Sequence, residues 1–161
     1  MIQRIQSVFL LLLAICMLVL LIAPIWQKIN PETNQVFELT AFSLHATGGE
    51  TEAGQDFNKN TMFIAVLAIV AAGVALFEIF QFKNRLKQMK LGLLNTLVLA
   101  GLMGLCLYYS TYVGEDLVAS TEPGSYRYGF FLPAAALFLN VLANRFIKRD
   151  EDLVRSVDRL R

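Results

Sequence analysis

Four long apolar runs constrain what this chain can fold into. They cover residues 8–25, 61–82, 91–113 and 129–147. Each is long enough for a helix that crosses a hydrocarbon core of about 30 Å. Hydrophobic residues make up 56% of the chain, above the share of about 45–50% found in soluble domains. The pattern predicts a single integral membrane domain over residues 1–161, an all-α, antiparallel bundle of four transmembrane helices.

A secretory signal peptide is the alternative interpretation of the first run. No A-x-A cleavage pattern follows it, and Pro24 and Trp26 are typical of a membrane boundary. We therefore interpret residues 8–25 as an uncleaved first span.

The longest polar segment, residues 27–60, follows this first span. Within it, residues 35–45 (QVFELTAFSLH) are rich in β-branched and aromatic side chains, which predicts one or two short strands. Gly48 and Gly49 then predict a turn, and residues 50–59 a mobile loop. A lone hairpin is marginal in water, so we expect a small β-containing cap that rests on the helix ends.

The basic residues predict the orientation. Residues 83–90 hold four of them and no acid between two apolar runs, which is typical of a short cytoplasmic turn. Counted over the whole chain, eleven lie in segments assigned to the inside and only Lys28, Lys59 and Arg127 lie outside. Both termini are therefore expected in the cytoplasm. The charged tail, residues 148–161, has Leu153, Val157 and Leu160 at helical spacing, so it is predicted to continue the fourth helix.

Polar residues inside the predicted spans are the first candidates for chemistry, since they are costly there and often functional. Glu78, Asn95, Asn140 and Asn144 all fall near the inner ends of their helices. Together they predict a polar cluster in the inner leaflet. Interhelical hydrogen bonding is one interpretation. The other is a site that handles protons, ions or a substrate.

Two charged surfaces are the candidates for binding. The tail mixes acids with bases, which favours docking of a protein over a nucleic acid. The basic turn is a candidate for anionic lipid binding, or serves topology alone. The predicted partner-binding residues are Lys148, Arg149, Asp150, Glu151, Asp152, Arg155, Ser156, Asp158, Arg159 and Arg161. The lipid-binding or topology residues are Lys83, Arg85, Lys87 and Lys90.

Catalytic and metal-binding patterns are not found in the sequence. There is no P-loop, G-x-S-x-G, H-E-x-x-H or dinucleotide fingerprint. His45 is the only histidine, and Cys16 and Cys106 both lie in apolar runs without metal-ligand spacing. We expect neither catalysis nor a cofactor.

Three stretches resemble a known family. They are MIQRIQ at residues 1–6, FKNR at residues 82–85 and NRFIKRDEDLVRSVDRLR at residues 144–161. The chain is similar through them to small four-helix inner-membrane proteins of the Bacteroidota, grouped as domain of unknown function 4293. The resemblance implies a multi-pass protein of the bacterial inner membrane. It implies no activity, cofactor or site residue.

The function predicted from these features is non-catalytic. We expect a small membrane subunit or scaffold that sits in the bilayer and docks another membrane or cytoplasmic protein through its tail. The alternative is a small transporter or channel that uses Glu78, Asn95, Asn140 and Asn144. The sequence leaves a homo-oligomer open, and it does not support nucleic-acid binding.

Overall fold

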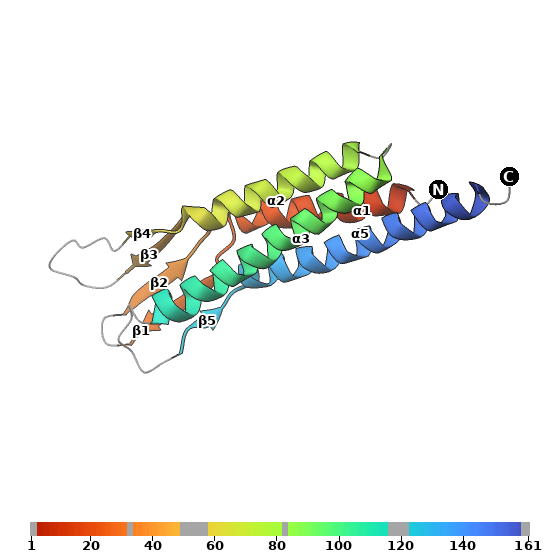
Figure 1. Ribbon diagram of the computed structural model, residues 1–161. Helices are drawn as coiled ribbons and strands as arrows, with labels where there is room; N and C mark the ends of the chain where they lie inside the picture. The colour runs from red at the N-terminus through yellow and green to blue at the C-terminus, as the bar shows by residue number, and fades with distance from the viewer. Residues whose placement is uncertain (1–2, 32–33, 49–57, 82–83, 116–122, 159–161) are drawn as a thin grey trace.

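The protein is an elongated bundle of four long helices with a small sheet at one end, as a computed structural model shows (Figure 1). The structure describes residues 3–31, 34–48, 58–81, 84–115 and 123–158, with side chains from Ile5 to Val154. Both termini lie at the end opposite the sheet, together with the connection between α2 and α3. We call these the termini end and the sheet end.

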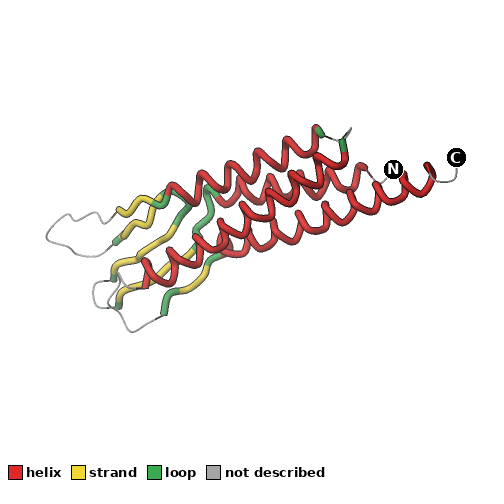
Figure 2. The backbone as a smooth tube through the Cα atoms, in the orientation of Figure 1, coloured by secondary structure: helices red, strands yellow, loops and turns green. Residues whose placement is uncertain are grey.

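The helices run antiparallel along the chain, and Figure 2 shows them side by side. Their bounds are α1 Gln3–Leu20, α2 Met62–Phe80, α3 Arg85–Tyr108 and α5 Tyr128–Asp158, and α3 continues into the π-helix η1, Tyr109–Gly114. Within the described residues, three helical segments are long and apolar enough to cross a membrane: Met62–Phe80, Arg85–Gly114 and Tyr128–Val154. The apolar part of α1, Ile5–Leu20, is shorter. The prediction of four helices from four apolar runs is confirmed.

Two helix boundaries differ from the prediction. The first helix covers residues 3–20 instead of 8–25, because the residue before Pro24 avoids the helical conformation and a strand begins at Trp26. The third helix begins at Arg85 instead of residue 91, so the predicted basic turn is largely helical. The Asn84 side chain caps this helix by accepting a hydrogen bond from the Lys87 N–H at 3.3 Å.

The other boundaries are close to the prediction. Helix α2 begins at Met62, whose N–H donates to Asn60 Oδ1 at 2.8 Å. Helix α5 is continuous as far as Asp158, which confirms that the fourth helix extends into the tail. It begins at Tyr128, so Pro133 lies in its second turn.

In the part of the chain that the structure describes, the sheet has five antiparallel strands in the order β4-β3-β2-β1-β5. One or two short strands were predicted within residues 35–45, and the structure has two there, β2 and β3; their turn lies at residues 40–42, ahead of Gly48. Three strands were not predicted, and β4 occupies part of the expected loop at residues 50–59, the rest of which lies outside the described residues. The strand bounds are β1 Trp26–Asn30, β2 Gln35–Leu39, β3 Ser43–Thr47, β4 Asn58–Asn60 and β5 Ser125–Tyr126.

Trp26 joins the sheet to the helices. Its side chain is 1% exposed, although the sequence suggested a residue at the membrane boundary. It lies against Gly114 and Gly124, where an added Cβ would come within 2.8 and 2.2 Å of the indole. Two residues without side chains, one at the end of η1 and one just before β5, therefore make the space that the indole ring fills.

The core runs from the helices into the sheet as one cluster. On α2 its buried face is made of alanines, which let neighbouring helices approach closely. On α1 and α3 it is made of larger apolar residues. The principal members are Leu13, Met17, Leu20, Ile25, Trp26, Leu39, Leu44, Ala65, Ala68, Ala71, Ala72, Ala75, Leu99, Leu102 and Ala136.

An ion pair crosses the sheet end. Lys28, on β1 and 3% exposed, donates to Glu115 Oε2 at 2.6 Å, and Glu115 Oε1 accepts the N–H of Gly124 at 2.9 Å. Partial burial alone would raise the pKa of Glu115. The hydrogen bonds from Lys28 and Gly124 and the charge of Lys28 outweigh burial, so the pKa of Glu115 is lowered.

This pair predicts a pH-dependent stability. Because the folded-state pKa of Glu115 is lowered, its contribution is complete above the unfolded-state value of about 4.3 and is lost as the pH falls through the folded-state pKa. Glu115→Gln is expected to lower the free energy of unfolding at pH 7 by about 1 kcal/mol, because the Glu115 side chain is 36% exposed and solvent screens the pair. Thermal unfolding of the purified proteins in detergent measures the difference in unfolding free energy between the wild type and the variant. This difference should become smaller below pH 4. Asp152→Asn, at the other end of the bundle, is the control. A constant difference from pH 7 to pH 3 would contradict this account.

Candidate functional site

The predicted polar cluster is buried inside the bundle at its termini end. Glu78, Asn95 and Asn140 are all 0% exposed, and Asn144 is half-buried. They come from three helices, α2, α3 and α5, as the spacing from the helix ends predicted. These side chains face the bundle interior, where an unpartnered polar group costs about 1–3 kcal/mol and an unpaired charge costs more.

Two buried amides were not predicted as members of the cluster. Gln6 of α1 is 3% exposed and Gln88 of α3 is 1% exposed. Gln88 Nε2 donates to the backbone carbonyl of Glu78 at 3.2 Å, which places it beside the last turn of α2. We call Gln6, Glu78, Gln88, Asn95, Asn140 and Asn144 the inner polar cluster.

The centre of the contact between α3 and α5 is Gly92. Its carbonyl oxygen accepts hydrogen bonds from Asn140 Nδ2 at 2.8 Å and from the Thr96 hydroxyl at 2.9 Å. Asn140 Nδ2 also donates to Thr96 Oγ1 at 2.9 Å. A Cβ at residue 92 would lie 2.0 Å from Asn144 Oδ1. The missing side chain is thus what lets Asn144 lie against α3.

Much of the inner polar cluster has no hydrogen-bond partner in the described part of the chain. Both oxygens of Glu78 and both polar atoms of Asn95 are unpartnered. So are the side-chain oxygens of Gln6, Gln88, Asn140 and Asn144. Interhelical hydrogen bonding therefore accounts for the amide nitrogens of Gln88 and Asn140 and leaves the carboxylate unexplained. Buried polar groups rarely lack partners in native proteins.

The predicted tail residues begin with an ion pair that the sequence did not reveal. Asp150 Oδ2 lies 3.2 Å from Arg85 Nη2, and Arg85 Nη1 donates to the Asp150 carbonyl at 2.8 Å. Both residues were predicted as binding residues on separate surfaces. The structure brings them together, so this pair fixes the start of α3 to α5 and is less available to partners.

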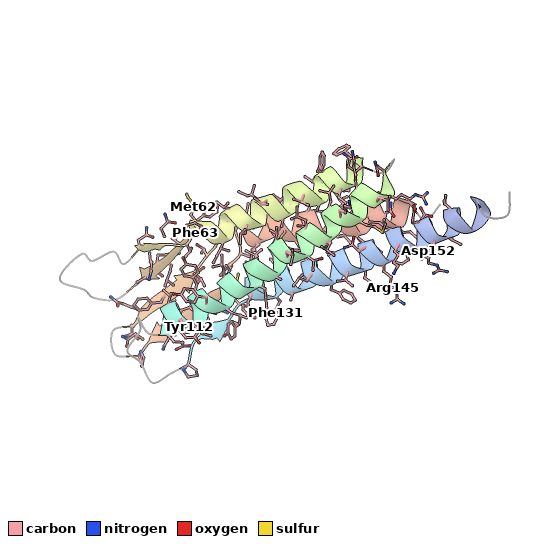
Figure 3. All side chains as sticks on the ribbon, viewed as in Figure 1. Met62, Phe63, Tyr112, Phe131, Arg145 and Asp152 are labelled. Carbon is pink, nitrogen blue, oxygen red and sulfur yellow. The ribbon has the colours of Figure 1, made fainter. Side chains whose placement is uncertain are left out.

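Beyond Asp150 the tail helix extends past the other three helices (Figure 1). Lys148, Arg149 and Asp152 are exposed, and Figure 3 shows Arg145 and Asp152 projecting from α5. Leu153 and Val154 are 49% and 43% exposed. The side chains of Arg155, Ser156, Asp158, Arg159 and Arg161 lie outside the described residues.

The basic segment borders a groove between α2 and α3. The groove has a volume of about 500 Å³ and is lined by Phe77, Gln81, Lys87, Lys90, Leu91 and Leu94. Two exposed ammonium groups above an apolar floor would suit an anionic lipid, and lipid binding here stays a prediction. Lys83 lies outside the described residues.

The comparisons with known proteins concern the whole chain. The family model described as a domain of unknown function (DUF4293) matches residues 2–160. The chain belongs to the DUF4293 family. This confirms the resemblance stated from the three sequence stretches. Among curated proteins, no match to this DUF4293 protein is found.

Helical spacing could have revealed the two missed amides. Gln88 lies four residues before Gly92 and seven before Asn95, on the stripe that continues through Leu99, Leu102 and Cys106. Gln6 precedes buried Leu10 by four residues. Both were missed because the predicted spans began at residues 91 and 8, after the residues concerned.

Gly92 provides a direct test of this packing. Gly92→Ala should lower the free energy of unfolding by about 1–3 kcal/mol, because its Cβ would displace Asn144. The matched control is Gly104→Ala on the same helix, where an added Cβ meets nothing within 4 Å; this variant should be as stable as the wild type or more stable. Thermal unfolding in detergent compares the two. The double variant Gly92→Ala/Asn144→Ala should recover part of the loss, and equal stability of the two single alanine variants would refute the contact.

Proposed function

We propose that this DUF4293 protein is a small, non-catalytic integral membrane protein that docks a partner protein at the termini end of its bundle. The outer faces of the helices support the membrane setting, because they expose large apolar side chains along their length. Soluble monomers rarely expose so extensive an apolar surface. Examples are Leu11, Ile15 and Leu18 on α1, Val66, Ile69 and Phe77 on α2, Leu93 and Leu97 on α3, and Phe138 and Val141 on α5.

Aromatic side chains at the sheet end support the same setting. Phe63, Tyr112 and Phe131 are 70%, 68% and 61% exposed, and Figure 3 shows them near the junction of helices and sheet. Aromatic rings gather where the hydrocarbon core meets the headgroups. Helix α1, with 18 residues, is about 27 Å long at 1.5 Å per residue. It is thus close to the length needed for a fourth span.

The charges support a cytoplasmic position for the termini end. Arg85, Lys87, Lys90, Lys148 and Arg149 gather there, and basic residues resist transfer across the membrane. The sheet would then lie outside the cytoplasm. With the family resemblance, this favours a multi-pass protein of the bacterial inner membrane with both termini inside.

The observation that carries the docking proposal is the projecting end of α5. The Arg85–Asp150 pair anchors the helix at the edge of the bundle, and the helix continues from there with both apolar and charged side chains exposed. A preformed helix with such a mixed surface loses little conformational freedom when it binds. The partner that fits is another membrane or cytoplasmic protein with a complementary mixed-charge surface.

Photocrosslinking in native membranes tests the docking proposal. A crosslinking amino acid at Asp152 should give a discrete protein adduct, because this side chain projects from the tail. The matched control is Phe131, which is also exposed on α5 but at the sheet end; a crosslinker there should label lipid. Deletion of residues 152–161 keeps Asp150 and should abolish co-purification of the adduct partner. An unchanged set of co-purifying proteins after this deletion would overturn the proposal.

The unpartnered atoms of the inner polar cluster favour a second candidate function, ion transport or conduction. A carboxylate inside an apolar bundle is typical of ion pathways. Cation flux into proteoliposomes that contain the protein tests this function. Glu78→Gln should reduce the flux at least tenfold, and the control Glu115→Gln should leave it unchanged. Flux equal to that of protein-free liposomes would exclude this candidate and leave the docking proposal intact.

A further inference from the structure

The interior of the bundle holds an excess of hydrogen-bond acceptors. Among the described residues, the unpartnered buried side-chain atoms comprise seven oxygens and one nitrogen, Asn95 Nδ2. The oxygens are Gln6 Oε1, Glu78 Oε1 and Oε2, Gln88 Oε1, Asn95 Oδ1, Asn140 Oδ1 and Asn144 Oδ1. An interior that needed only mutual hydrogen bonds between helices would balance donors with acceptors.

The amide orientations are fixed by the backbone. Gln88 Nε2 is held by the carbonyl of Glu78, and Asn140 Nδ2 is held by the carbonyl of Gly92 and by Thr96. Turning either amide over would give up these bonds and place its oxygen against a carbonyl oxygen. Asn140 thus uses both of its N–H donors and Gln88 uses one of its two, and the oxygens of both amides remain as acceptors.

Helix geometry directs three of these side chains toward the level of Gly92. Helical side chains lean toward the N-terminus of their own helix, so Glu78 leans from the last turn of α2 into the bundle. Asn95 leans in the opposite direction, back toward Gly92, since α3 runs antiparallel to α2. Asn144 Oδ1 already lies against Gly92. Gln88 and Asn95 are separated by about 10 Å along the helix, with Gly92 between them.

The charge of the cluster limits what it can hold. Glu78 is its one carboxylate, and Arg85, at the same end, is bound to Asp150. Oxygen-only ligands select hard cations over transition metals. Divalent ions usually recruit several carboxylates, whereas no group of three or more His, Cys, Asp or Glu gathers among the described residues. One carboxylate with several neutral oxygens matches one monovalent charge.

We propose that Glu78, Asn95 and Asn144 form an internal binding site for a monovalent metal cation of the Na⁺ type, supported by Gln88 and Asn140. A proton would neutralise Glu78 but would satisfy one acceptor only. A metal cation can contact several of the oxygens at once. The site does not depend on partner docking, and an ion can reside there whether or not it is transported.

Binding of radioactive Na⁺ to the purified full-length protein tests the site directly. At fixed pH and ionic strength, with N-methylglucamine as the replacement cation, we expect saturable binding of one ion per chain. Unlabelled K⁺ and choline serve as competitors that report selectivity. Saturable binding of Na⁺ or K⁺ supports the proposal, and the absence of binding of both overturns it without affecting the docking proposal.

Thermal unfolding of variants tests which residues bind the ion. Because a ligand of the folded state raises stability with its concentration, the wild-type midpoint should rise as Na⁺ replaces N-methylglucamine. Glu78→Gln should weaken the apparent Na⁺ affinity at least tenfold. If Glu78→Gln does not fold, Asn95→Leu is the alternative variant, and it should weaken the affinity to a similar extent. Glu115→Gln, which removes a carboxylate outside the bundle, should keep the response. A midpoint that depends on pH but not on Na⁺, or a full response in Glu78→Gln, would overturn the proposal.

Discussion

The close approach of the helices along the alanine face of α2 is the interaction on which the rest of the structure depends. In the membrane setting that we propose, there is no hydrophobic force between helices, so packing of small residues has to bring them together. Ala68, Ala71, Ala75 and Glu78 follow one another at spacings of three and four residues. The stripe that lets α2 pack closely therefore ends in the carboxylate, and the same packing buries Glu78.

The strands at the sheet end are short, and a small sheet is stable only when its apolar face is packed against other elements. Support comes from pairing β1 with both β2 and β5, so that segments almost a hundred residues apart share one sheet. Trp26 fills the space beside Gly114 and Gly124, and the Lys28–Glu115 pair closes the same junction. The cap is in this way an extension of the bundle core and not a separate hairpin.

Sequence reasoning found the features that depend on local pattern. Apolar runs predicted the helices, and residues 35–45 predicted one or two strands where β2 and most of β3 lie. Positions within the runs predicted a polar cluster at the inner helix ends, and Glu78 and Asn95 are buried there. Features that depend on distant partners were missed. Strand β1 (WQKIN) has little β-branched character, and β5 has two residues. Strand β1 pairs with β2 over its whole length, and β5 pairs with β1 over two residues, so both depend on pairing partners that their own residues do not indicate.

The same limit applies to the candidate site. Arg85 and Asp150 are 65 residues apart. The sequence around each residue predicts only a solvent-exposed charge. The role of Gly92 also cannot be predicted from its neighbours in sequence. A glycine in an apolar run indicates close helix packing, but it does not identify the residue that packs against it. Only the fold identifies Asn144 as the residue that uses this space.

Helix α5 connects the two regions to which we assign roles. Asn140, Asn144, Ile147 and Asp150 recur at spacings of three and four residues, and Asn140 and Asp150 contact α3 directly. This face is committed to the bundle as far as Asp150, and the helix beyond it extends past the other helices. A partner that holds the projecting part thus holds the helix that carries Asn140 and Asn144. Binding at the tail and occupancy of the inner polar cluster would act on one rigid element, with Arg85 as the point where that element leaves the bundle.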